Sequence, residues 1–421
     1  MHGAWGATLI NDTETERMMA ELVSPLADVA DISNDRLKIH IVRDDDFNAF
    51  VAGGDDVYVY TGLLKQIKTP GALQAVIAHE LGHTLGGHMA QMSQRMNAEM
   101  KRSMLIQALG IGLMVVGGNP SLGAGVLAGS SGVVQQSMLA FTRDEERIAD
   151  NMGVNLMCEA GLDPNGFITV LEQMRDMTGV LESKINPNRI NHPLTTERLA
   201  NVREQIAQKK DTKKATNKPD IDGYELVRAK LIGYLDSFEH VLEMYPYTDK
   251  SNPALYARAI ANMRGGNLDM ARIGTQTLIS RMPNNPYFYE LLGDIEYQFG
   301  HYDDSIVSYE KALELAGDAP QIQTALALVL TERKKADDNK RAIELAKRAL
   351  LHESAPLTYW VLARAYGDND GGRYAWAMAE YSMLINKEAD AKKYAKQAQK
   401  ALKKNDAEYI KAGDILKHKS K

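Results

Sequence analysis

The feature that most restricts the fold of this chain is a repeat in its second half. Prolines stand at positions 253, 286, 320 and 356, so they recur at intervals of 33, 34 and 36 residues. A period of about 34 residues is typical of tetratricopeptide repeats, in which each unit is a pair of helices. Each pair leaves an apolar face that only a neighbouring pair can cover, so we expect the pairs to stack into a solenoid.

One copy shows this pattern in detail, NPYFYELLGDIEYQFGHYDDSIVSYEKALELAGDAP at 285–320. Its characteristic residues are Leu292, Gly293 and Tyr297 in the first helix, Tyr302 at the turn, and Ile306 and Ala312 in the second helix. A plain helical bundle is the alternative, which the phased prolines disfavour. Such repeats offer a concave surface to peptides and carry no chemistry of their own.

At 421 residues the chain is too long for one ordinary core, so at least two domains are expected. Its formal net charge of -6 does not indicate a nucleic-acid-binding protein, and we expect no such partner. The polar run QKKDTKKATNKPDID at 208–222 is typical of a linker. We therefore predict a first domain over 1–207, a linker over 208–222 and a helical repeat domain over 223–421.

The first half mixes helix and strand patterns. Apolar spacing predicts a helix over 14–30, and alternation predicts strands in 36–44 and 55–62. A long helix is expected from Pro70 to Met96 and another from Thr142 to Gly161. The predicted fold class is mainly α: an α+β domain with a small antiparallel sheet, followed by an α-solenoid.

The Gly-rich apolar segment 104–140 admits two interpretations. Its first part, MLIQALGIGLMVVGG, has about fifteen residues, short of the roughly twenty that span a bilayer. We favour buried or lid-forming helices near the site, and a peripheral contact with a membrane surface is the alternative.

The chemistry of the first half is concentrated in HELGH at 79–83. His79 and His83 are one helical turn apart and share a face, and Glu80 can act as a base on a water at a metal held between them. The single cysteine, Cys158, excludes a Cys-based zinc site. Two unrelated histidines on an exposed helix are the alternative, which the apolar residues of this helix disfavour.

Zinc in a catalytic site usually has three protein ligands. In one class of peptidase a third histidine follows in HExxHxxGxxH, but Met89 stands at that position here. His88 is one residue short and would lie about 140° around a continuing helix from His83. We therefore expect His88 to be a residue at the helix end or beside a ligand, and not a ligand.

A better source of the third ligand is FTRDEERIAD at 141–150. Glu146 and Asp150 are four residues apart and share a helix face. Glu146 would bind the metal, and Asp150 would accept a hydrogen bond from a ring N–H, which we expect to be that of His79. Glu145 is the competing candidate, but it faces elsewhere on such a helix.

With these motifs, the first half resembles the zinc metallopeptidases of the HtpX, CAAX prenyl protease and BepA group. Four landmarks follow in order: NAFVAGG at 48–54, HELGH at 79–83, TRDEERIAD at 142–150 and NHPLTTER at 191–198. The resemblance covers most of residues 10–205. The repeats make it most similar to the periplasmic, BepA-like branch.

The resemblance implies one zinc ion per chain, with Glu146 as third ligand and Glu80 as catalytic base. It places Asn48 and Ala49 on an edge strand beside the cleft, where an extended substrate would add by backbone pairing. It also implies that His192 either stabilises the oxyanion or occupies the open position on the metal. An exposed loop histidine is the alternative for His192.

We therefore expect a zinc-dependent endopeptidase of the bacterial envelope that cleaves unfolded or misassembled polypeptides. The repeats would recruit these substrates or the envelope assembly machinery. We expect a periplasmic location, with a signal peptide removed ahead of the present sequence. The alternative is a tetratricopeptide scaffold or chaperone whose metal site is structural or plugged.

Overall fold

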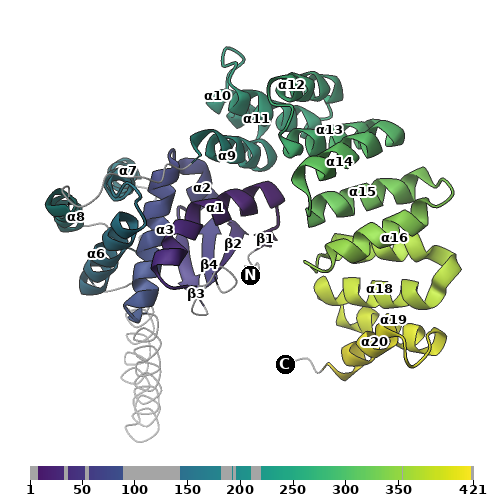
Figure 1. Cartoon of the computed structure of the whole chain (residues 1–421). Helices are drawn as coiled ribbons and strands as arrows, with labels where there is room; N and C mark the ends of the chain where they lie inside the picture. The colour runs from purple at the N-terminus through teal and green to yellow at the C-terminus, as the bar shows by residue number, and fades with distance from the viewer. Residues whose placement is uncertain are drawn as a thin grey trace, which may run out of the picture. The chain divides into compact units, whose positions relative to one another are not determined.

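The computed structural model describes residues 8–32, 37–52, 56–88, 143–181, 192, 196–209, 220–352 and 354–418. They form two compact units, described separately below (Figure 1). The first unit comprises Met1–Asn11 and Thr15–Arg228, and the second comprises Asp12–Glu14 and Ala229–Lys421. The segments 104–140 and 210–219 lie outside the described residues, so the linker and lid predictions stay predictions.

The first unit contains a four-stranded sheet in the order β1-β2-β4-β3. Its strands are β1 (Thr8–Ile10), β2 (Lys38–Arg43), β3 (Ala49–Ala52) and β4 (Asp56–Tyr60). In β4, Val57 and Val59 are fully buried, whereas the residues between and around them are partly exposed. This alternation is what a strand with one buried face requires.

The sheet is mixed, which corrects the prediction of a small antiparallel sheet. β1 pairs antiparallel with β2 and β3 pairs antiparallel with β4, but β2 and β4 pair in parallel. The reason is that β3 lies between β2 and β4 in the sequence and the chain reverses twice. β4 therefore runs in the direction of β2 and inserts beside it, which leaves β3 at the edge.

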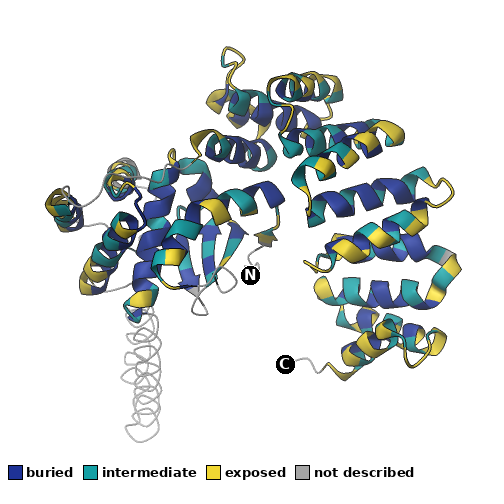
Figure 2. Cartoon of the chain, viewed as in Figure 1, coloured by how far each residue is buried: buried dark blue, intermediate teal, exposed yellow. Residues whose placement is uncertain are grey.

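The described residues of the first unit also include six helices that end before Arg228, the last residue of this unit. They are α1 (Thr13–Val29), α2 (Thr61–Gln66), α3 (Pro70–Leu85), α6 (Arg143–Glu159), α7 (Asn165–Leu181) and α8 (Thr196–Lys209). α3 is the central helix, packed against β3, α6 and α7 and buried along most of its length (Figure 2). Since α3 carries the HELGH motif, the motif lies within the core.

α3 is shorter than the predicted helix from Pro70 to Met96. It ends at Leu85, and Gly86 is its C-cap. Gly87 then takes a positive φ of 66°, a conformation that favours glycine. The two glycines therefore turn the chain out of the helix axis.

The second unit consists of helices in successive antiparallel pairs. They are α9 (Ile221–Leu235, which contains the division between the units), α10 (Phe238–Met244), α11 (Asn252–Arg264), α12 (Leu268–Arg281), α13 (Pro286–Phe299), α14 (Tyr302–Ala316), α15 (Pro320–Arg333), α16 (Asp338–Ala349), α17 (Pro356–Tyr366), the 3-10 turn η2 (Gly367–Asp370), α18 (Gly371–Leu384), α19 (Glu388–Ala401) and α20 (Ala407–Lys417). The four phased prolines stand in the first turns of α11, α13, α15 and α17. Proline suits that position because its missing N–H has no partner there.

The copy at 285–320 has the predicted form. Gly293 lies in α13 and Tyr302 begins α14, and Ile306 and Ala312 are buried between neighbouring helices. The predicted solenoid of helix pairs is confirmed. Of the helices that the structure describes, none combines the length and apolar character needed to cross a membrane.

Candidate metal centre

α3 presents both histidines of the HELGH motif on one face. The helix begins with Thr69, whose side chain accepts a hydrogen bond from the Ala72 N–H, followed by Pro70 in the first turn. His79 and His83 follow in the second half, with exposed fractions of 7% and 1%. Imidazoles buried this deeply need polar partners, and the structure supplies them from other elements.

α6 supplies the third donor because it crosses α3 unusually closely. A Cβ atom on Gly82 would lie 2.6 Å from the carbonyl oxygen of Ala149 on α6. The glycine of HELGH therefore permits the close approach of the two backbones. Glu146, one turn before Ala149, is thereby directed at the two histidines and is 1% exposed.

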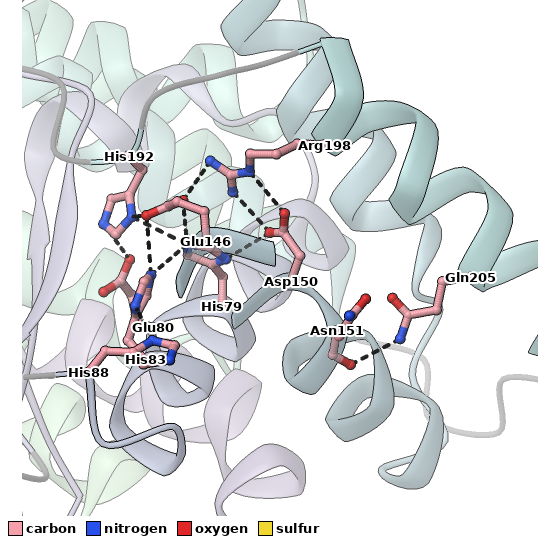
Figure 3. Close-up of polar contacts among 10 residues, drawn as sticks. All are labelled: His79, Glu80, His83, His88, Glu146, Asp150, Asn151, His192, Arg198 and Gln205. Carbon is pink, nitrogen blue, oxygen red and sulfur yellow. Dashed lines mark hydrogen bonds and ion pairs between the residues drawn. The ribbon is translucent and has the colours of Figure 1, made fainter. Parts of the chain in front are cut away.

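The donor atoms lie at the spacing expected around a single ion (Figure 3). His79 Nε2 is 3.1 Å from His83 Nε2 and 3.4 Å from Glu146 Oε2. His83 Nε2 is 3.5 Å from Glu146 Oε1. A tetrahedral zinc with bonds of about 2.0–2.1 Å separates its donor atoms by about 3.3–3.4 Å. His79, His83 and Glu146 are therefore spaced to bind a single zinc ion.

His192 lies beside these three donors. Its Nδ1 is 2.8 Å from Glu146 Oε1 and 3.3 Å from His79 Nε2, while its Nε2 is 3.2 Å from Glu80 Oε1. His79, His83, Glu146 and His192 offer ligand atoms that all lie within 4.8 Å of one another. His192 is therefore within reach of both the metal position and the base, and an isolated surface location is excluded.

Burial and opposite charges set the protonation of these groups. Burial lowers the pKa of His83 to about 4, so its ring is neutral at pH 7, the form that binds metals. Burial also opposes the charged form of His192, but the carboxylates of Glu80 and Glu146 outweigh it and raise the pKa of His192 to about 10.

The two carboxylates are held ionised. Burial alone would raise the pKa of Glu146, but hydrogen bonds from His192, His79 and His83 hold it well below its usual value. Burial likewise acts to raise the pKa of Glu80, and the charge of His192 outweighs it and lowers that pKa. Glu80 is therefore in the form that accepts a proton.

Each helical histidine also contacts a neighbour through Nδ1, the ring nitrogen that faces away from the other donors. His79 Nδ1 is 2.9 Å from Asp150 Oδ1, as predicted for that carboxylate. His83 Nδ1 is 2.9 Å from His88 Nδ1. Because the helix ends at Leu85, the expectation that His88 lies 140° around a continuing helix does not apply.

The position of the His88 ring beside His83 depends on Gly86. A Cβ atom on Gly86 would lie 2.6 Å from His88 Nε2 and 2.8 Å from its Cε1, so a larger side chain there would collide with the imidazole. His88 is 2% exposed. The geometry places it as a partner of His83, and the expectation that it is not itself a ligand stays a prediction.

Arg198 of α8 also belongs to the site, although no sequence pattern pointed to it. Its guanidinium contacts Glu146 Oε2 at 2.6 Å and both oxygens of Asp150 at 2.9 Å. Burial acts to raise the pKa of Asp150, but the hydrogen bond to His79 and the Arg198 charge lower it. The only signal was the position of Arg198 at the end of NHPLTTER, a motif in which its role could not be read from spacing.

The predicted substrate strand lies where it was expected. Ala49 begins β3, the edge strand, and the carbonyl of Asn48 accepts a hydrogen bond from the Tyr60 N–H at 3.1 Å. Both residues line a pocket together with His79 and Glu80. Their role in binding substrate remains a prediction.

Known proteins resemble this chain in the same region. The model of peptidase family M48 matches residues 13–206. The chain is 25% identical over 330 residues to the beta-barrel assembly-enhancing protease of Escherichia coli (strain K12), a match that covers 76% of this chain and 66% of that protein. It is 27% identical over 194 residues to the mitochondrial metalloendopeptidase OMA1 of Schizosaccharomyces pombe, covering 46% of this chain and 54% of that protein.

Among solved structures, a thermophilic TPR protein of Thermus thermophilus aligns with 47% of this chain and 92% of that chain at 17% identity. The TM-score of this alignment is 0.27. The metallopeptidase prediction is confirmed by the family match, which contains the HELGH helix and the Glu146 helix. Residues 13–206 of this chain are thus similar to peptidase family M48.

Proposed function

We propose that this chain is a zinc-dependent endopeptidase of the bacterial envelope that cleaves unfolded or misassembled proteins. The observation that carries the proposal is the spacing of His79, His83 and Glu146, which suits one tetrahedral ion, with the Glu80 carboxylate beside it. Two imidazoles and a carboxylate form a donor set found in catalytic zinc sites. Zinc bound there would polarise a peptide carbonyl and lower the pKa of a water molecule.

The remaining steps fall to side chains of the protein. Glu80, held ionised beside His192, would accept the proton of the attacking water and deliver it to the leaving amine. Asp150 would fix the His79 ring through Nδ1 and raise its basicity. Arg198 would in turn hold Asp150 and Glu146 in place.

His192 has two candidate roles, both consistent with its position. As an oxyanion donor it would stabilise the charge that develops on the substrate carbonyl. As a fourth ligand it would occupy the remaining coordination position of the metal and keep the enzyme inactive. The 3.3 Å distance from its Nδ1 to His79 Nε2 supports the second role in this conformation, because it matches a tetrahedral edge.

The choice of substrate rests on the relatives and the repeats. The Escherichia coli relative is named for enhancing beta-barrel assembly, and this chain spans 66% of its length. We propose a periplasmic location and substrates among envelope proteins that have failed to assemble. The helix pairs would recruit those chains or the assembly machinery by their concave surface.

A second candidate is a repeat scaffold or chaperone with a structural metal site. The proximity of His192 to the three donors favours it, since structural zinc sites are closed by a fourth protein ligand. In that case the site would stabilise the fold and cleave nothing.

A casein assay separates the two candidates. We expect zinc-loaded wild type to cleave casein and Glu80→Gln to bind zinc equally but lose at least about 100-fold in rate, as expected for loss of a general base. Glu159→Gln, an exposed glutamate of α6, is the matched control and should retain wild-type activity. Equal zinc content with no cleavage that depends on Glu80 would rule out the peptidase and favour the scaffold.

The role of His192 is read from His192→Ala in the same assay. A rise in activity identifies a resting fourth ligand. A fall, with zinc content unchanged, identifies a catalytic residue.

A further inference from the structure

Three aromatic rings form a continuous stack across the sheet of the first unit. His40 of β2, Tyr58 of β4 and Phe50 of β3 are partners in the strand register, so their side chains project from the same face. The ring centroids of His40 and Tyr58 are 4.7 Å apart, and those of Tyr58 and Phe50 are 4.9 Å apart with an interplanar angle of 7°. Neighbouring strands lie about 4.7–4.9 Å apart, so each ring lies flat against the ring of the next strand.

Phe50 is the last ring of this aromatic stack. Among the described strands, β3 pairs with β4 only. One face of the Phe50 ring lies against Tyr58, so the other face is directed to the open edge of the sheet. Tyr60 contacts the same ring edge-on, with centroids 6.0 Å apart, and thereby holds its orientation. A flat and partly exposed ring therefore lies beside the position that an added strand would take.

The backbone of β3 sets the register of an added strand. The Tyr60 N–H donates to the Asn48 carbonyl, and in an antiparallel ladder such hydrogen-bonded pairs recur at every second residue. Phe50 therefore directs its backbone groups to β4, whereas Ala49 and Val51 direct theirs to the open edge. A substrate strand bound to Ala49 and Val51 would place one residue directly opposite Phe50. If that strand is antiparallel, this is a pair without hydrogen bonds, in which the two side chains lie closest.

The open face of the Phe50 ring is separate from the metal centre. Adjacent residues of a strand point to opposite faces of the sheet. Ala49 is buried and lines the space beside His79 and Glu80, so Phe50 projects from the other face. The substrate residue opposite Phe50 would likewise point away from the metal, while its two neighbours point toward it. Its side chain can therefore strengthen binding of the substrate strand without contact with the reacting atoms.

We propose that Phe50 selects substrates with an aromatic side chain at the position opposite it, where a fourth ring extends the aromatic stack. The inference rests on the proposed endopeptidase function and names a residue that determines its specificity. Contact between aromatic rings stabilises a pair beyond the burial of apolar area alone. We expect phenylalanine or tyrosine at this position to raise kcat/KM about 3-fold over leucine and about 10-fold over serine.

The test begins with a casein segment that the zinc-loaded wild type cleaves, identified by mass spectrometry. Internally quenched peptides carry this segment with Tyr, Phe, Leu or Ser placed at each position in turn. We expect one position at which the aromatic peptides are cleaved faster and at which this preference depends on Phe50. Cleavage that depends on Glu80 but shows no such position would overturn the inference while the proposed function stands. Absence of any cleavage that depends on Glu80 would overturn the proposed function, and this inference with it.

Two variants of Phe50 separate the flat ring from its apolar bulk. Phe50→Leu removes the ring, so the advantage of the Tyr peptide over the Leu peptide should disappear at that position and persist at any other. Phe50→Tyr keeps the ring and should retain the advantage. Leu9→Ala, at a residue of the opposite edge strand β1 that is 47% exposed, is the matched control and should leave the ratio unchanged. Each ratio compares two peptides on one enzyme sample, so a loss of folded enzyme lowers both rates equally.

A second copy of this chain is the other strand that could add to β3. Analytical ultracentrifugation distinguishes the two occupants, and we expect the same sedimentation for wild type and Phe50→Leu. Dimers of the wild type that Phe50→Leu dissociates would show that another copy covers the Phe50 ring, and would overturn the inference. An aromatic preference that Phe50→Leu leaves intact would also overturn it, because another surface would then set the specificity.

Discussion

At the residue scale, both helical histidines use the ring nitrogen that faces away from the donor cluster. His79 contacts Asp150 and His83 contacts His88, each at 2.9 Å through Nδ1. A partner at this position fixes the tautomer and the orientation of a metal-binding imidazole. The sequence suggested the first partner by its i, i+4 spacing from Glu146. The second became clear only from the turn at Gly86 and Gly87.

The contact between His88 and His83 should therefore support metal affinity. We expect His88→Ala to raise the zinc dissociation constant by about 10- to 100-fold, because the His83 ring loses this orienting contact. His88→Gln, whose amide can still form a hydrogen bond, should recover part of the loss. Competition with a coloured chelator measures both, with His240→Ala, a partly exposed histidine of the second unit, as control. An unchanged dissociation constant in His88→Ala would contradict the assignment.

The proton on His192 gives a second prediction. In the metal-free protein its pKa is raised from 6.5 to about 10. The bound proton therefore stabilises the fold fully below pH 6.5, and this contribution is lost as the pH rises through 10. If His192 is a ligand, zinc uptake at pH 8 must release this proton, so wild type should release about one proton more than His192→Ala. An indicator dye in weak buffer measures the release, and equal release from the two proteins would exclude His192 as a ligand.

At the scale of elements, helix geometry explains which parts of the site could be predicted. His79, Glu80 and His83 share one helix, and Glu146 and Asp150 share another, so their faces follow from spacing alone. Arg198 comes from a third helix, and no local periodicity relates it to the other two. The parallel pairing of β4 with β2 could likewise not be predicted, because the alternation of apolar residues identifies a strand but not its neighbours in the sheet. Resemblance to a known family, rather than spacing, pointed to His192 and the edge strand.

The close crossing of α3 and α6 can be tested at Gly82. A methyl group there would meet the Ala149 backbone, so Gly82→Ala should lower the free energy of unfolding by about 1–3 kcal/mol. It should also weaken zinc binding, because α6 carries Glu146. Gly71→Ala on the same helix is the matched control, since a Cβ there has nothing within 4 Å, and it should stabilise by about 0.5–1 kcal/mol. Urea unfolding measures both, and equal effects would contradict a specific close approach.

At the scale of the whole molecule, the chain combines a peptidase unit and a repeat unit. Each has its own buried core: α3 and the sheet contribute to the first, and the stacked helix pairs form the second. The phased prolines made the repeat unit predictable because every pair obeys the same local rule. The fold of the peptidase unit depends on contacts between segments far apart in sequence. Its motifs therefore predicted the residues of the site, whereas they did not predict the strand directions of the sheet.

Removal of the metal should therefore affect one unit selectively. A ligand that binds only the folded state stabilises it by about 4 kcal/mol at a thousand times its dissociation constant. We expect a chelator to lower the melting temperature of the calorimetric transition of the first unit and to leave that of the second unit unchanged. In Trp5→Phe the remaining tryptophans, Trp360 and Trp376, both lie in the second unit, so their fluorescence should report the unchanged transition. A fluorescence melting temperature that falls with the chelator would contradict this division.

The central claim is that His79, His83 and Glu146 hold one zinc ion beside Glu80. The most direct measurement is anomalous diffraction at the zinc edge from crystals of the zinc-loaded protein. The account predicts one peak per chain, about 2.0–2.1 Å from Nε2 of both histidines and beside the Glu146 carboxylate. No peak there, or a single peak instead at the cluster of Glu296, His301 and Asp304, would contradict it.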